Sequence, residues 1–316
     1  MRFAVDPWDP SYGTSLGTEL GESAAQVALD VELPASQWRP IDPDPAVAPP
    51  EAVLFVDGVR RVDAQVWVED GGAEATPALC ASYAAGVVCC CRERGAHLVT
   101  ADVRRGLFTT AESAEDVRTT AGTYRATRTA AHPDVAPAQL LSLAVQRELA
   151  DAELAAAAAA RGGHGSADDL LVVDGPLRGR QHLPRVIGFV KTHRSDYLPP
   201  QLGGVVAALG TGQRTPVFRL GSSWERHTWY LRLPCRPGAP WAGIVRVECS
   251  ADLAPAEAVA HAARSQVTLP RFASTEYKDS RAPQNLYPIA GLERELRRRL
   301  GEPNLLYRAL RRAAAA

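Results

Sequence analysis

Lysine and asparagine are almost absent from this chain of 316 residues. The only lysines are Lys191 and Lys278, and the only asparagines are Asn285 and Asn304, so nearly all of the positive charge is arginine. A nucleotide-composition bias in the source genome accounts for such scarcity. The two lysines are nevertheless worth following, because lysine and arginine bind phosphate in different ways.

Paired metal-binding cysteines are also missing. Cys89, Cys90 and Cys91 are adjacent, the other three cysteines are isolated, and no Cys-x-x-Cys pair exists to hold zinc. We therefore expect buried thiols rather than a metal site or a disulfide framework.

Long apolar runs and a signal sequence are absent as well. No run of 18 apolar residues exists, and the N-terminus has no apolar signal core, so we expect a cytoplasmic protein with no membrane segment. The net charge of -1 identifies no partner by itself, but the charge is uneven. Residues 1–56 carry two arginines against nine acidic residues, whereas residues 271–316 carry ten basic against five acidic residues. An acidic front and a basic tail can bind different partners.

The pattern of the chain predicts an α/β protein. Residues 1–50 are rich in Pro, Asp and Gly and are interpreted as an extended N-terminal arm followed by a linker. Residues 51–316 form the remaining domain, in which we expect a β-meander over 53–110 and a helix over 111–127. A long alanine-rich helix follows over 137–160. Further strands are predicted at 170–173, 186–191, 215–220, 228–233 and 243–249, and helices at 254–266 and 292–300. This order implies a mixed sheet flanked by helices.

Two buried strands each end in Asp-Gly, at Asp57-Gly58 and at Asp174-Gly175. An aspartate at the end of a buried strand is costly unless it is paired. Two such strands side by side would bring two carboxylates together, and like charges at short range need a cation between them. Mg²⁺ and Mn²⁺ prefer carboxylate oxygens, so the pair predicts a divalent-metal site. Two ordinary Asp-Gly turns remain the alternative.

A third carboxylate is expected from the alanine-rich helix. Glu148 and Glu153 both flank its apolar face around Leu149. Either residue taken alone is also consistent with a solvated helix position.

The segment from Glu276 to Ile289 has the most unusual composition. It holds Lys278, Asp279, Arg281 and Asn285, together with two prolines and two tyrosines. Lys278 and Arg281 are suited to holding a phosphodiester, and Asp279 to completing a metal shell. The alternative is a structural loop whose charges cap the next helix.

Together, these motifs resemble the NurA-domain nucleases. The resemblance rests on the strand ending at Asp57-Gly58, the Asp-Gly-Pro-Leu at 174–177, the strand at 187–191 and the Lys-Asp-Ser-Arg-Ala-Pro-Gln-Asn at 278–285. It covers about residues 50–312. It implies a ribonuclease-H-like fold, a toroidal homodimer, Mn²⁺-dependent (or Mg²⁺-dependent) exonuclease and endonuclease cleavage of DNA, and a hexameric HerA-type translocase as partner in double-strand-break end resection.

By position, the resemblance matches Asp57 and Asp174 to the two strand aspartates of the family and Glu153 to its helix glutamate, with Glu148 as the fallback. Many members carry a late histidine near the metal. Here His261 lies in an apolar helix, and Asp279 is preferred for that role.

Four further residues, Lys191, Arg194, Tyr230 and Asn285, are also assigned to DNA binding. Lys191 and Arg194 belong to a basic cluster that follows a buried strand, and they are expected to hold backbone phosphate. Tyr230 either stacks on a base or packs in the core.

Three functions therefore remain in view. The first is a two-metal DNA nuclease that uses Asp57, Glu153, Asp174 and Asp279. The second is a catalytically silent clamp that binds DNA ends and docks on an ATPase through the acidic first 50 residues. The third is a hydrolase for a small phosphoester.

Overall fold

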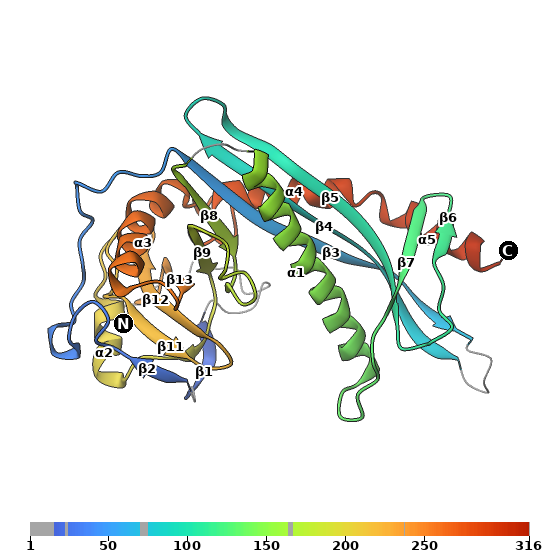
Figure 1. Ribbon diagram of the computed structural model, residues 1–316, viewed down its shortest axis with the longest axis horizontal. Helices are drawn as coiled ribbons and strands as arrows, with labels where there is room; N and C mark the ends of the chain where they lie inside the picture. The colour runs from blue at the N-terminus through green and yellow to red at the C-terminus, as the bar shows by residue number, and fades with distance from the viewer. Residues whose placement is uncertain (1–15, 23–24, 70–74, 164–166, 237, 316) are drawn as a thin grey trace. The chain divides into compact units, whose positions relative to one another are not determined.

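A computed structural model describes residues 16–22, 25–69, 75–163, 167–236 and 238–315 (Figure 1). Two compact units make up the chain. The first unit comprises Met1–Phe55, Cys89–Ala96 and Ser166–Ala290, and the second comprises Val56–Val88, His97–Gly165 and Gly291–Ala316.

The strands and helices alternate irregularly along the chain. The strands are β1 (Leu16–Glu22), β2 (Gln26–Ala28), β3 (Ala52–Val68), β4 (Thr76–Cys91), β5 (Gly95–Thr109), β6 (Val117–Thr119), β7 (Gly122–Arg128), β8 (Asp169–Asp174), β9 (Val186–Val190), β10 (His193–Asp196), β11 (Phe218–Gly221), β12 (Glu225–Arg232) and β13 (Ile244–Ser250). The helices are α1 (Pro137–Gly163), α2 (Pro200–Ala207), α3 (Pro255–Thr268), α4 (Tyr287–Arg299) and α5 (Pro303–Ala314), with short 3-10 turns at Ala35–Gln37 and Leu269–Phe272.

A large mixed sheet organises these elements, as the sequence predicts. Its strand order is β2-β11-β12-β13-β9-β8-β3-β4-β5-β7-β6. The β8–β9 and β5–β7 pairs are parallel, whereas the pairs from β11 to β9 are antiparallel. The α/β class is therefore confirmed.

In the first unit, helices cover both faces of the sheet. The indole of Trp229 in β12 donates to Ser265 Oγ of α3 at 3.1 Å. Its neighbour Tyr230 lies on the opposite face, where it packs with Val206 of α2 and with Phe218. This alternation follows from the two-residue period of a strand.

The N-terminal segment differs from the expected arm and linker. Strand β2 pairs with β11, and Ile41 forms a bridge with Arg214. Trp38 is buried against Phe218, with ring centroids 5.6 Å apart. The described residues after Ala25 are therefore part of the packed first unit. Their apolar side chains pack against residues that are distant in the chain, so local composition does not predict this packing.

In the second unit, β3, β4 and β5 form the predicted meander. Gly58 of β3 and Tyr83 of β4 face α1, through Glu153 and Glu148 respectively. Their neighbours Val59 and Ala84 face the other way and pack on Leu292 and Leu296 of α4. Helix α1 thus lies on one face of these strands and α4 on the other.

Two predictions about this unit are wrong. The helix expected over 111–127 is the hairpin β6–β7, whose turn is closed by a bond from Thr119 Oγ1 to the Gly122 carbonyl at 2.7 Å. Gly122 has a φ of 127°, and the flanking valine, threonine and tyrosine residues favour strands. Similarly, Asp57-Gly58 does not end its strand, because β3 continues without a break to Val68.

Among the described helices, none combines the length and the apolar character needed to cross a membrane.

Candidate functional site

Asp174 is the last residue of β8, after the fully buried run 170–173. The chain turns at Gly175, whose φ of 113° is readily adopted only by glycine. One carboxylate oxygen, Oδ2, accepts a hydrogen bond from Lys191 Nζ at 2.6 Å. The other, Oδ1, is buried and accepts no hydrogen bond from any part of the chain that the structure describes. A buried carboxylate oxygen without such a partner is able to serve as a metal ligand.

A chain of polar contacts links Asp174 to the unusual segment before α4. Lys191 Nζ also donates to Asn285 Oδ1 at 3.2 Å. The amide nitrogen of Asn285 donates in turn to Asp279 Oδ2 at 2.7 Å, and Asn285 is fully buried. Lys191, Asn285 and Asp279, which were all predicted as site residues, are thus brought together with Asp174 in the first unit. In this network Asp279 is connected to Asp174 only indirectly, through Asn285 and Lys191.

Buried Glu248 holds the turn that follows Asp174. Its Oε1 accepts the backbone N–H of Leu177 at 2.7 Å, and its Oε2 accepts a hydrogen bond from Arg246 at 2.6 Å. The guanidinium of Arg226 lies 3.3 Å from the same Oε2. Gly188 allows this approach, since a Cβ there would lie 2.9 Å from both Glu248 Cγ and the Gly175 carbonyl. The sequence predicts no role for Glu248, because Leu177, whose N–H it accepts, is 71 residues away in the chain.

Asp57 is a buried residue of β3, the strand next to β8 in the sheet order. The two strands begin together, since Ala52 N–H donates to the Asp168 carbonyl at 3.3 Å. Asp57 follows Ala52 by five residues along β3, and Asp174 is the last residue of β8. Asp57, Asp174 and Glu293 form a group that offers one carboxylate oxygen each, with these oxygens all within 4.8 Å of one another.

Glu293 was not predicted from the sequence. It lies in α4, four residues after Ile289 and three before Leu296, both of which are fully buried. An acidic residue within the apolar stripe of a helix was therefore the available signal. It was missed because the third carboxylate was expected from the alanine-rich helix, which is α1.

Glu153 and Glu148 occupy different places on α1. Glu153 is buried, and its Oε1 would lie 2.6 Å from a Cβ added at Gly58, so its carboxylate covers the backbone directly after Asp57. Glu148 accepts a hydrogen bond from Tyr83 at 3.4 Å, and the pKa of Tyr83 is raised to about 12 by burial and by this carboxylate. Of the two, Glu153 is the one beside Asp57. It is not a member of the three-carboxylate group.

The other predicted phosphate-binding residues are spread more widely. Lys278 is exposed, with Nζ 5.4 Å from the Tyr277 ring centroid and 5.8 Å from that of Tyr287. Arg281 lies 4.0 Å from Asp279, on the same turn. Arg194 is in β10, but its side chain falls outside the described part of the structure.

Two further interpretations are resolved by burial. Tyr230 is fully buried between Phe218 and Trp241, so it packs in the core and is not available to stack on a base. His261 lies in α3 beside Arg264, and burial lowers its pKa. The structure gives His261 no contact with Asp174 or Asp279 among the described residues.

A scan against models of protein families finds no match to this sequence, and a search of curated proteins finds none either.

Proposed function

We propose that this protein is a metal-dependent nuclease that hydrolyses DNA phosphodiesters. The observation that carries the proposal is the buried, unsatisfied Oδ1 of Asp174 within a group of three carboxylates. Carboxylates this close repel one another unless a cation lies between them. Carboxylate oxygens without sulfur or imidazole favour a hard ion such as Mn²⁺ or Mg²⁺.

Asp57, Asp174 and Glu293 would hold the cation. When bound, such an ion polarises a phosphoryl oxygen and lowers the pKa of a water molecule. Glu153 would keep the backbone after Asp57 in place, because its carboxylate lies against Gly58. Glu248 would likewise keep the turn after Asp174 in place through the N–H of Leu177.

Lys191 would bind the substrate phosphate. An ammonium group has three donors, and within the described structure two of them are used by Asp174 and Asn285. The third is available for a phosphate oxygen beside the carboxylates. The exposed Lys278 and the turn residue Arg281 would extend the contact along the backbone of the nucleic acid, which positions DNA without reading its sequence.

The resemblance to NurA-domain nucleases supplies the finer part of the proposal. A meander β3–β4–β5, the helix α1, and then β8 added beside β3 is compatible with a ribonuclease-H-like core. On this basis we propose a cytoplasmic homodimer that works with a HerA-type translocase on broken DNA ends.

The test is release of nucleotides from linear DNA with and without Mn²⁺. We expect Asp57→Asn, Asp174→Asn and Glu293→Gln each to lower the rate by about 100-fold or more, the factor that roughly 3 kcal/mol of lost transition-state stabilisation represents. Asp151→Asn is the matched control, because Asp151 is an exposed acidic residue on α1, two positions from Glu153.

The proposal fails if the aspartate variants cut DNA at the wild-type rate. Tight binding of DNA ends with no metal-dependent turnover in the wild-type protein would instead favour the catalytically silent clamp.

A further inference from the structure

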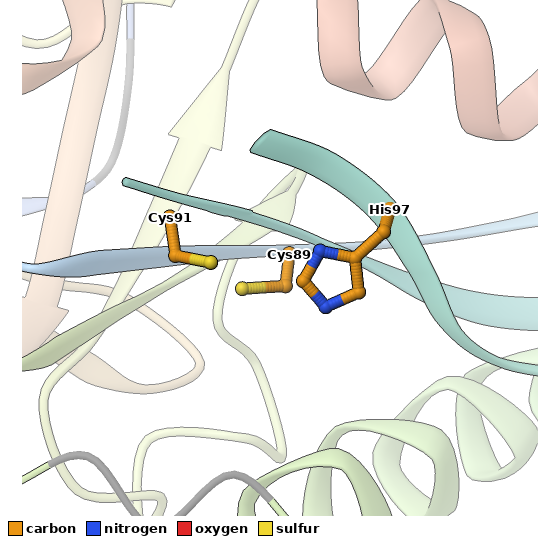
Figure 2. A group of neighbouring side chains, drawn as sticks. All are labelled: Cys89, Cys91 and His97. Atoms are coloured by element: carbon orange, nitrogen blue, oxygen red, sulfur yellow. The ribbon is translucent and has the colours of Figure 1, made fainter. Parts of the chain in front are cut away.

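A second group of ligand side chains lies at the end of the β4–β5 hairpin. Strand β4 ends at Cys91, the turn is Arg92–Arg94, and β5 begins at Gly95, whose φ of 62° closes the hairpin. Cys89 and Cys91 are two residues apart in a strand, so their side chains lie on the same face. Figure 2 shows the two thiols side by side, with the ring of His97 turned toward Cys89 from the neighbouring strand.

The spacing of these side chains is close to that of a coordination shell. The sulfur atoms of Cys89 and Cys91 and a ring nitrogen of His97 all lie within 4.8 Å of one another. Ligands of a tetrahedral zinc ion are about 3.5–3.8 Å apart, given metal–sulfur and metal–nitrogen bonds of about 2.3 and 2.1 Å. Small side-chain rotations therefore close the remaining gap, and the three residues lie within nine consecutive positions of one hairpin.

We propose that Cys89, Cys91 and His97 bind one thiophilic transition-metal ion, with Zn²⁺ as the expected occupant. Two thiolates and one imidazole form a soft ligand set that favours Zn²⁺ over Mg²⁺ or Mn²⁺. Two thiolates would also neutralise the charge of the ion. Cys91 and His97 are half-buried, so a water molecule can reach the fourth position.

A disulfide is the competing chemistry for two neighbouring thiols. All six cysteines are present as thiols in the structure. Residues two apart in a strand have Cα atoms about 6.7 Å apart, at the upper end of the range for disulfides. A metal ion spans that separation without straining the strand, which favours coordination over oxidation.

The pattern explains why the sequence does not reveal this site. Its cysteines form a Cys-x-Cys pair, and its histidine lies across a turn, so neither matches the Cys-x-x-Cys spacing of common zinc sites. The site is separate from the carboxylate group, and the two ligand sets would select different ions by their softness.

Zinc affinity, measured on the reduced, chelator-stripped full chain by competition with a chromophoric chelator, tests the proposal. We expect one Zn²⁺ per chain in the wild-type protein. Cys91→Ser and His97→Gln should each bind it more than about 100-fold more weakly, because even loss of an outer-shell partner costs roughly 10–100-fold. Cys90→Ser is the matched control, since Cys90 lies between the two ligands in sequence but on the other face of the strand.

Cobalt provides a second measurement. Wild type and Cys90→Ser should show the thiolate-to-cobalt charge-transfer absorption, and the two ligand variants should lose it while keeping wild-type circular dichroism. If Cys91→Ser does not fold, His97→Gln alone decides. Equal zinc affinity in the ligand variants and wild type would overturn the proposal. So would a Cys89–Cys91 disulfide formed under mild oxidation in a protein that binds no zinc when reduced.

Discussion

At the scale of single residues, buried His193 links stability to pH. Its ring lies between Tyr230 and Trp241, with centroids 5.7 and 5.2 Å away, and its Nε2 is 3.1 Å from the Ile244 carbonyl. Burial lowers the pKa of His193 from 6.5 to about 4. The unfolded chain therefore takes up a proton near pH 6.5, whereas the folded chain does so only near pH 4.

The free energy of unfolding should consequently fall between pH 6.5 and pH 4. The contribution of His193 to this loss is about 3 kcal/mol at the acid end of the window, because protons bind the unfolded state first. His193→Gln keeps a donor near the Ile244 carbonyl but does not titrate in this range. Urea unfolding at several pH values should show a shallower pH dependence for this variant, and identical curves would contradict the assignment.

The scarce residue types, lysine and asparagine, are also placed by the structure at this scale. Lys191 and Asn285, one of two lysines and one of two asparagines, contact each other next to Asp174. The sequence marked these residues as unusual and placed both in the site. Only the structure pairs Lys191 with Asn285, because 94 residues separate them.

At the scale of elements, the packing of α1 on β3 depends on Gly58. A Cβ at this position would lie 2.6 Å from both Glu153 Oε1 and Leu149 Cδ1. The glycine therefore permits the close approach of the helix to β3.

Gly58→Ala should force α1 away from β3. We expect a loss of about 1–3 kcal/mol in the free energy of unfolding, which is the usual cost of overpacking. Urea denaturation provides the measurement. Gly162→Ala serves as the control, because nothing lies within 4 Å of a Cβ at that helical position, so alanine should be neutral or stabilising there. Equal stabilities for the two variants would show that α1 does not pack tightly against Gly58.

Element prediction succeeded where the apolar pattern was strong and local. The buried strands β8, β9 and β13 and the helices α1 and α3 lie close to the predicted ranges. The strands are short, mostly apolar runs, and the apolar residues of the helices repeat at the helical period. The hairpin β6–β7 was mistaken for a helix. Its strands are short and polar, and pairing of β7 with β5 stabilises it rather than any periodic pattern.

At the scale of the whole molecule, the N-terminal segment is a structural part of the first unit. Glu32 accepts hydrogen bonds from both terminal nitrogens of Arg214, at 2.7 and 2.9 Å, and from Val217 N–H at 2.8 Å. Arg214 is almost completely buried. The residues around Glu32 thus neutralise a charge in the core, which is a different role from that of a free acidic arm.

Glu32→Ala should destabilise the protein by about 3 kcal/mol or more, because it leaves a buried guanidinium without its carboxylate. Glu225→Ala is the control, since it removes the exposed ion pair with Arg219 and should cost less than about 1 kcal/mol. Thermal or urea unfolding of the two variants tests this. A deletion of residues 1–45 should be at least as damaging as Glu32→Ala, and a stable truncated protein would contradict the structural role.

The sequence by itself determined the α/β class, the buried strands and the position of Asp174 at a strand end. These features depend on side-chain period and on neighbours in the chain, which can be read locally. The tertiary structure decided which polar groups meet: Glu293 with the two aspartates, Glu248 with the turn after Asp174, and Cys89 with His97. Most of these partners are tens of residues or more apart or lie across a turn, so pairing of strands and packing of helices bring them together.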